Sequence, residues 1–200
     1  MTGLWNDFND AQSNTNVIPK GTLARVRLTI RPGGFDDPGQ GWTGGYARRG
    51  STGAVYLDAE YTVLEGPYAR RNIFTLIGLY SPKGPDWANM GRSLVRGMLN
   101  SARGISDKDT SPEAQAARRI NGFADLDGLE FVARIDIGSD AVGEDKNEIR
   151  AAVTPDHRDY APVMGTAGHG YQPPAQPAPQ PTAAPQPTAP AAPGRPAWAE

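Results

Sequence analysis

In the first half of the sequence, the dominant feature is short segments in which apolar and polar side chains alternate. In TLARVRLTIR, residues 22–31, small or aliphatic side chains occupy every second position, and arginine lies between them at Arg25, Arg27 and Arg31. This period is typical of a β-strand that turns one face to a core and the other to solvent. We therefore expect a strand here, with the aliphatic row inside and the arginine row outside.

Four further segments predict strands, at residues 54–64, 70–80, 129–137 and 147–153. Residues 34–53 are rich in glycine and predict a long loop. Between the third and fourth strands, apolar side chains spaced by three and four residues predict a helix from Asp86 to Gly104, and a shorter helix follows from residue 112 to about 120. The order predicts a mainly β fold: an OB-like β-barrel of five strands with a helical insertion between strands 3 and 4.

The sequence style of several segments is more specific than their order. The segments YTVLEGPYARRNIFTLIGLYS, LDGLEFVARIDI and NEIRAAVTPD resemble a family of phage and prophage proteins of unknown function. Its members are often encoded beside recombination and replication genes and are suspected of binding single-stranded DNA. The resemblance covers residues 17–160 and implies the same binding for this chain. It also matches the turn 65–68 and the basic pair that follows it, Arg70 and Arg71.

Proline and alanine change the character of the chain after residue 160, since residues 161–200 contain eleven of each. Such a composition buries too little apolar surface to fold, so we expect a disordered tail at 161–200, a domain at 17–160 and an N-terminal arm at 1–16. The tail is either a passive linker or a tether that docks replication or recombination proteins through Trp198 and Glu200. It lacks the acidic run found at the end of bacterial single-stranded-DNA-binding proteins.

Several classes of function find little support in the composition. The chain has no cysteine and two histidines, so we expect no metal site, no cofactor and no enzymatic activity. A nuclease that uses Asp58 and Glu60 is a remote alternative. The N-terminus lacks the pattern of a signal peptide and no segment is a transmembrane candidate, so we expect a cytoplasmic protein without a membrane partner; self-association stays open.

Charge is divided unevenly along the chain. Residues 20–103 contain 12 basic and 6 acidic side chains, a net charge of +6, whereas residues 104–160 contain 7 and 13, a net charge of −6. Unpaired nucleic acid is held by cations along its phosphates and by flat rings under its bases. The candidates for phosphate binding are Arg25, Arg27, Arg31, Arg48, Arg49, Arg70 and Arg71, and those for base stacking are Trp42, Tyr46 and Tyr56.

Alternatives remain open at several of these positions. The strand arginines either face a polyanion or pair with carboxylates such as Asp58 and Glu60. Trp42 either stacks on a ligand or folds back on the barrel. The sequence predicts sequence-tolerant binding of single-stranded DNA in phage-type replication or recombination; the alternative is a structural or protein-interaction β-barrel of a virion or assembly that binds no nucleic acid.

Two further sets of side chains are expected to be structural. One set consists of aromatic residues at inward or turn positions and is expected in the core: Tyr68, Phe74, Trp87, Phe123 and Phe131. The other is a row along the long helix and is expected to be its solvated face: Asn89, Arg92, Arg96, Asn100 and Arg103.

Overall fold

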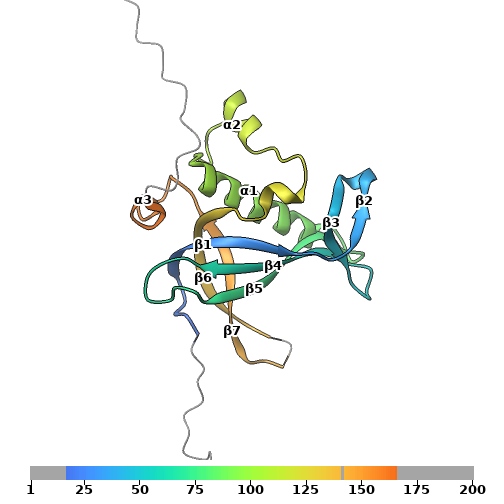
Figure 1. The fold of residues 1–200 in the computed structure, drawn as a ribbon, viewed down its shortest axis with the longest axis horizontal. Coiled ribbons are helices and arrows are strands. Elements are labelled where there is room, and N and C mark those ends of the chain that lie inside the picture. The colour runs from blue at the N-terminus through green and yellow to red at the C-terminus, as the bar shows by residue number, and fades with distance from the viewer. Residues whose placement is uncertain (1–16, 141, 166–200) are drawn as a thin grey trace, which may run out of the picture.

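One antiparallel sheet of seven strands organises the computed structural model, which describes residues 17–140 and 142–165 (Figure 1). The strands run in the order β2-β3-β4-β1-β6-β7, and β5 pairs with the other edge of β4. Their bounds are β1 (Thr22–Arg31), β2 (Phe35–Asp37), β3 (Trp42–Arg49), β4 (Val55–Val63), β5 (Asn72–Tyr80), β6 (Glu130–Ser139) and β7 (Asp145–Val153). The mainly β class is therefore confirmed.

The helical segments connect strands or follow the last one. They are the 3-10 turns η1 (Pro38–Gln40) and η2 (Phe123–Leu126) and the helices α1 (Asp86–Arg103), α2 (Pro112–Ala117) and α3 (Tyr160–Met164). α1 and α2 fall between β5 and β6, as the sequence predicted, and η2, which it did not predict, follows them. α1 ends where Gly104 adopts a left-handed φ of 65° and donates its N–H to the Asn100 carbonyl. None of the helices within the described ranges has the length and apolar character needed to cross a bilayer.

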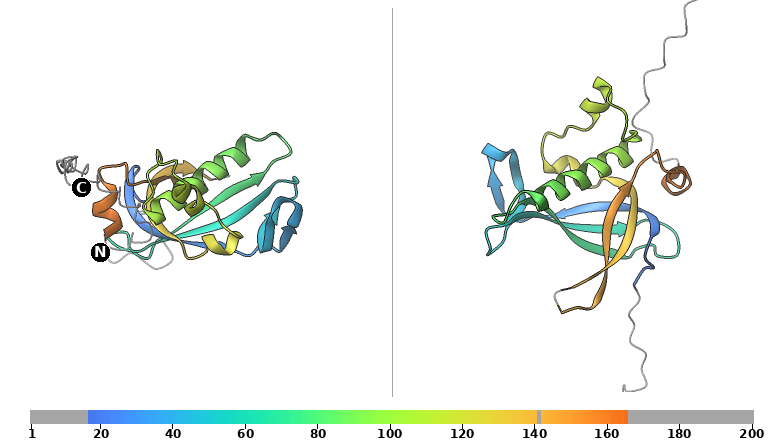
Figure 2. Two further views of the ribbon diagram at one scale, coloured as in Figure 1. Left: turned by 90° about the horizontal axis from the view of Figure 1, so that it is seen from above. Right: turned by 180° about the vertical axis from the view of Figure 1, so that it is seen from behind.

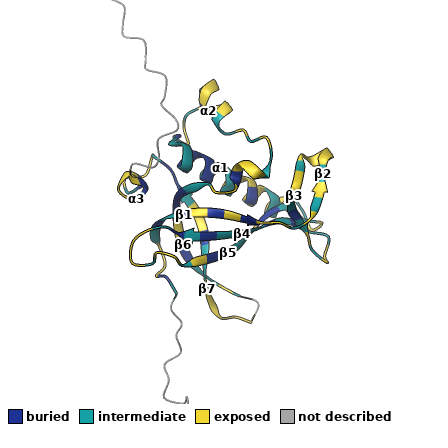
Figure 3. Cartoon of the chain, in the orientation of Figure 1, coloured by how far each residue is buried: buried dark blue, intermediate teal, exposed yellow. Residues whose placement is uncertain are grey.

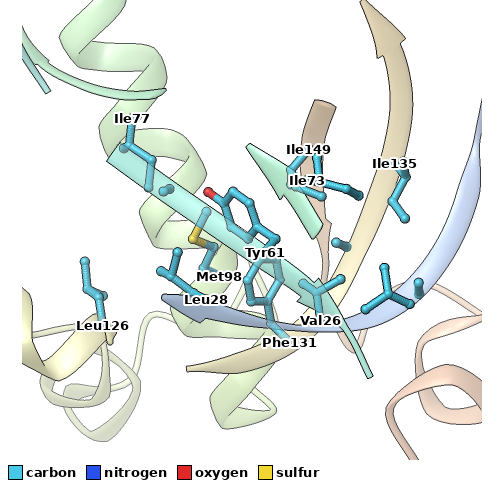
Figure 4. Packing of buried hydrophobic residues seen from close by; sticks show 14 of the residues in the cluster. Val26, Leu28, Tyr61, Ile73, Ile77, Met98, Leu126, Phe131, Ile135 and Ile149 are labelled. Carbon is cyan, nitrogen blue, oxygen red and sulfur yellow. The ribbon is translucent and has the colours of Figure 1, made fainter. Parts of the chain in front are cut away.

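The alternation of β1 and β4 builds the main core. Val26, Leu28, Leu57 and Tyr61 are fully buried, and on both strands buried residues alternate with more exposed ones (Figure 3). The Tyr61 ring meets the Phe131 ring edge to face, with centroids 6.0 Å apart (Figure 4). Burial raises the pKa of the Tyr61 hydroxyl. One face of the sheet thus carries the apolar core, to which α1 contributes Met98 and Leu99.

Residues 35–49 form a hairpin, so the prediction of a loop was wrong there, while residues 50–53 are a turn. β2 and β3 pair between Phe35 and Ala47, and the N–H groups of Gly33 and Gly34 both donate to the Gly45 carbonyl. A Cβ at Gly33 would overlap the Ala47 carbonyl oxygen, so glycine allows this close approach. Because β3 continues into pairing with β4, the hairpin extends the sheet (Figures 1 and 2).

α3 lies at the opposite end of the molecule from the β2–β3 hairpin (Figure 2). Tyr160 and Met164 pack with Val132 and Val153 in a second apolar cluster, and the Tyr160 hydroxyl donates to the Ser101 carbonyl at 2.5 Å. α3 continues past residue 160 into residues that the sequence assigned to the tail. The N-terminal arm at 1–16 and the tail residues Trp198 and Glu200 lie outside the described residues.

Candidate nucleic-acid interface

The outward side chains of β1, β4 and β5 form one surface, here called the outer face. Register fixes its rows, because Arg31 lies opposite Asp58, and Asp58 lies opposite Leu76 on the next strand. The neighbouring row runs from Thr29 through Glu60 to Phe74. Basic, acidic and apolar side chains therefore follow one another across the three strands.

Glu130 of β6 holds two of the predicted phosphate-binding residues. The Arg25 Nη2 atom lies 2.5 Å from one carboxylate oxygen, and the Arg27 Nη2 atom lies 2.6 Å from the other. Burial would raise the pKa of Glu130, but the hydrogen bonds and charges of Arg27 and Arg25 hold it below its usual value. A second carboxylate, that of Glu65, lies 3.9 Å from the Arg25 Nη1 atom. Both guanidiniums thus pair with a carboxylate, as one of the two interpretations expected, although the partner is Glu130 and not Asp58 or Glu60.

Arg31 combines an ion pair with an aromatic contact. Its Nε atom lies 3.5 Å from the Glu60 carboxylate, and its guanidinium carbon lies 4.5 Å from the centre of the Phe74 ring. Phe74 is 47% exposed, so its predicted place in the core was wrong. Its neighbour Ile73 is buried, and the period of two from Ile73 to Phe74 was the signal that could have placed this ring outside.

The candidate binding residues of the hairpin contact different parts of the protein. Arg48 lies 3.7 Å from the Asp58 carboxylate and also donates to the Pro32 carbonyl. Arg49 is exposed, with its guanidinium carbon 5.8 Å from the Phe35 ring centre. The partly buried Tyr46 side chain packs against the main core.

Trp42 is half-buried beside Phe35, with ring centroids 6.5 Å apart and planes tilted by 54°. It thus packs within its own hairpin, which favours the folded-back interpretation for one side of its ring. The other aromatic candidate, Tyr56, lies on the outer face, 6.2 Å from the Trp87 ring of α1. Of the remaining aromatic residues expected in the core, Phe131 is a buried member of the main core, and Tyr68 and Phe123 are partly buried and pack against that core.

Arg70 and Arg71 lie in the turn between β4 and β5, at the end of these strands away from the hairpin. Arg70 adopts a φ of 68°, and its N–H donates to the Val63 carbonyl. The hairpin pairs with β4 as far as Leu57, and β4 ends at Val63, so about 20 Å of strand separates the turn from the hairpin. The structure therefore does not gather the ten candidates at one point but distributes them along the outer face and beyond its two ends.

Apolar side chains on β5 are the feature that the sequence prediction missed. Five large hydrophobic residues are exposed in the described part of the chain, and three of them belong to β5: Phe74, Leu76 and Tyr80. Phe74 and Leu76 belong to the outer face, whereas Tyr80 lies opposite the buried Val55 beyond a β-bulge. Exposed apolar side chains that lie together mark an interaction site. The position of Phe74 and Leu76 beside the strand arginines makes the outer face the best candidate site.

The predicted solvated row of α1 is only partly correct. Asn100 is buried, where it donates to the Asp107 carboxylate and accepts a hydrogen bond from Arg118 Nε at 2.7 Å. Arg103 donates to the Ala117 carbonyl. These contacts attach the segment around α2 to α1, whereas Arg92 and Arg96 are exposed as expected.

The carboxylates proposed for the nuclease alternative contact cations or amides. Glu60 contacts Arg31 and accepts a hydrogen bond of 2.6 Å from the Asn72 side chain, and Asp58 contacts Arg48. In the described ranges, no group of three or more His, Asp or Glu side chains is placed to hold a metal ion.

No protein-family model matches the sequence, and no curated protein is detectably similar to it.

Proposed function

We propose that this chain binds single-stranded DNA without strong base preference, through the outer face of an OB-like barrel. The observation that carries the proposal is the exposed Phe74 ring beside Leu76, with Arg31 of β1 over it. Arg25 and Arg27 belong to the same strand as Arg31. Binding of unpaired strands combines stacking on such rings with cations along the backbone. The resemblance to phage proteins supports a role in phage-type replication or recombination.

Strand order supports the OB-like part of the proposal. The five long strands follow the order β5-β4-β1-β6-β7, and α1 is inserted between the third and fourth of them in sequence. Leu76 and Ile77 of β5 and Ile149 of β7 line a common groove, which Leu94 of α1 also borders. In this assignment the outer face includes the second and third strands, and the β2–β3 hairpin is the loop between the first and second. OB-folds bind oligonucleotides with these parts.

Ion pairs on the outer face reduce the affinity of its arginines for phosphate. A phosphate that approaches Arg25 or Arg27 must displace Glu130, and one that approaches Arg31 must displace Glu60. Stacking on Phe74 has no such competitor on its exposed side. We therefore assign the larger share of affinity to stacking and a smaller share to the paired arginines.

The test is fluorescence anisotropy with a labelled oligo-dT of about 30 nucleotides, long enough for several OB-type sites, and with a duplex of equal length. We expect preference for the single strand and a loss of about 5- to 100-fold in Phe74→Ala, because stacking contributes about 1 to 3 kcal/mol per base. Val142→Ala removes an exposed apolar side chain from the β6–β7 turn and serves as the matched control. Absence of binding at low salt would contradict the proposal.

A protein-interaction module is the second candidate, because exposed Phe74, Leu76 and Tyr80 would also suit a protein partner. It predicts no binding of oligo-dT by the wild type. It also predicts that Phe74→Ala weakens self-association or partner binding, which sedimentation velocity measures.

A further inference from the structure

A cavity of about 630 Å³ lies where the β2–β3 hairpin, α1 and η2 approach one another. Its volume falls in the range of small-molecule sites, about 300 to 1,000 Å³. Trp42 lines it from the hairpin, Phe123 from η2, and Leu79 from the end of β5. The residues that line this cavity differ from the Arg31 and Phe74 pair that carries the proposed function.

Three arginines line this cavity and no carboxylate does: Arg92, Arg96 and Arg118. Neutral groups fix the Arg118 guanidinium, through the Asn100 side chain and the Ser106 and Asp109 carbonyls at 2.7 to 2.8 Å. Arg96 donates to the Asp107 carbonyl at 3.2 Å. Neither Arg92 nor Arg96 takes part in an ion pair within the described residues.

The arginines of the cavity differ from those of the outer face in the groups that surround them. On the outer face, carboxylates accompany Arg25, Arg27 and Arg31, so their charge is compensated within the protein. In the cavity no carboxylate lines the wall beside the three arginines, and Arg92 and Arg96 form no ion pair within the described residues, so the site is basic and attracts an anion. Guanidinium groups match phosphate oxygens in both charge and geometry.

Trp42 adds a flat apolar wall to the same cavity. One side of its ring is supported by Phe35, which itself lies below the Arg49 guanidinium. The indole is therefore positioned by its own hairpin before any ligand arrives. An aromatic wall together with uncompensated guanidiniums fits a ligand that carries a planar base and a phosphate.

We infer that the cavity binds one nucleotide, with its base against Trp42 and its phosphate against Arg92 and Arg96. The nucleotide is either a free monophosphate or one unit of a strand that crosses the outer face. In the second form the inference rests on the proposed function. In both forms the base contacts Trp42 and the phosphate contacts Arg92 and Arg96. They differ in whether the nucleotide is free or part of a strand.

The indole N–H signals in an NMR spectrum of the full chain test the inference. The chain has four tryptophans, and Trp42→Phe identifies the Trp42 signal. Thymidine monophosphate should shift this signal in a saturable manner, and thymidine should shift it far less because it lacks the phosphate. If the monophosphate leaves the Trp42 signal in place, the free-nucleotide form is wrong.

A double variant tests the role of the arginines. Arg92→Ala with Arg96→Ala should abolish the shift caused by the monophosphate. The pair Arg134→Ala with Arg158→Ala removes the same charge from exposed positions outside the cavity and should preserve it. If the shift persists in the cavity variant, the phosphate site is wrong.

Oligo-dT separates the two sources and also separates this inference from the proposed function. A Trp42 shift with oligo-dT, lost in the cavity variant together with part of the affinity, supports the strand form. If the monophosphate shifts Trp42 but oligo-dT does not bind, the cavity takes free nucleotide and the proposed function fails. If oligo-dT binds and neither ligand moves the Trp42 signal, the inference is wrong while the proposed function stands.

Discussion

The Arg31 guanidinium carbon lies 4.5 Å from the centre of the Phe74 ring, across one strand of the sheet. Both side chains belong to the outer face, and β4 separates their strands. The contact holds one side of the ring and leaves Phe74 47% exposed. If the proposed function holds, Arg31 acts on a base through Phe74 as well as on a phosphate directly.

Arg31→Lys tests this arrangement because it keeps the charge and removes the planar group. We expect the affinity for oligo-dT to fall a few-fold, since an exposed cation–π contact contributes about 0.5 to 1 kcal/mol. The measurement is anisotropy at fixed salt. Arg27→Lys is the matched control because Arg27 contacts a carboxylate rather than a ring. Equal losses in the two variants would contradict a special role for the stacked pair.

Glu130→Gln should strengthen the binding of single-stranded DNA. The substitution keeps the shape of the side chain and removes the charge that holds Arg25 and Arg27. Phosphates would then meet two guanidiniums without a competing carboxylate, and we expect an increase of a few-fold to about tenfold. Titration of oligo-dT with both proteins measures it. Unchanged or weaker binding would mean that strands do not reach these arginines.

Stability should depend on pH through the same carboxylate. Two arginines hold the pKa of Glu130 below its unfolded value of about 4.3, so the stabilisation is complete above that pH. It is lost as pH falls through the lower native pKa, because the folded protein must then accept a proton. Urea unfolding at several pH values should therefore show a larger free energy of unfolding for the wild type than for Glu130→Gln near neutral pH. The difference should shrink in acid; a constant difference would contradict this account.

α1 approaches β5 through two glycines, and this contact should tolerate no added carbon. A Cβ at Gly91 would overlap the Gly78 carbonyl oxygen, which belongs to the backbone and cannot move aside cheaply. We expect Gly91→Ala to lower the free energy of unfolding by about 1 to 3 kcal/mol or more. Gly97→Ala in the same helix is the control, since its Cβ would lie 3.4 Å from the Ala152 Cβ and alanine favours helix. Thermal unfolding compares the two, and equal stability would disprove the close packing.

The sequence predicted the elements whose side-chain period is visible locally. Alternation identified β1 and β4, and the three- and four-residue spacing identified α1, which ends at Gly104 as expected. The β2–β3 hairpin was missed because residues 34–53 have many glycines and little alternation. Its pairing depends on contacts of Gly33 and Gly34 with Gly45 and on the continuation of β3 beside β4.

The candidate site was harder to predict because its partners are distant in sequence. Glu130 is separated from Arg25 by 105 residues, and only the pairing of β1 with β6 brings them together. The cavity between the hairpin and α1 likewise joins Trp42 to Arg92 through packing that no local pattern reports. Phe74 is different, because the alternation of β5 already contained the signal.

Salt dependence offers the last test, since it counts the cations that replace counterions. If all seven candidate arginines met phosphates freely, log affinity against log salt would have a slope of about −5, at about 0.7 per phosphate for a single strand. Arg25, Arg27, Arg31 and Arg48 contact carboxylates, so phosphates there displace protein groups and release fewer ions. Arg49, Arg70 and Arg71 remain, and we expect a slope of about −2. Glu130→Gln should steepen it by about 1, whereas a wild-type slope near −5 would mean that the ion pairs impose no competition.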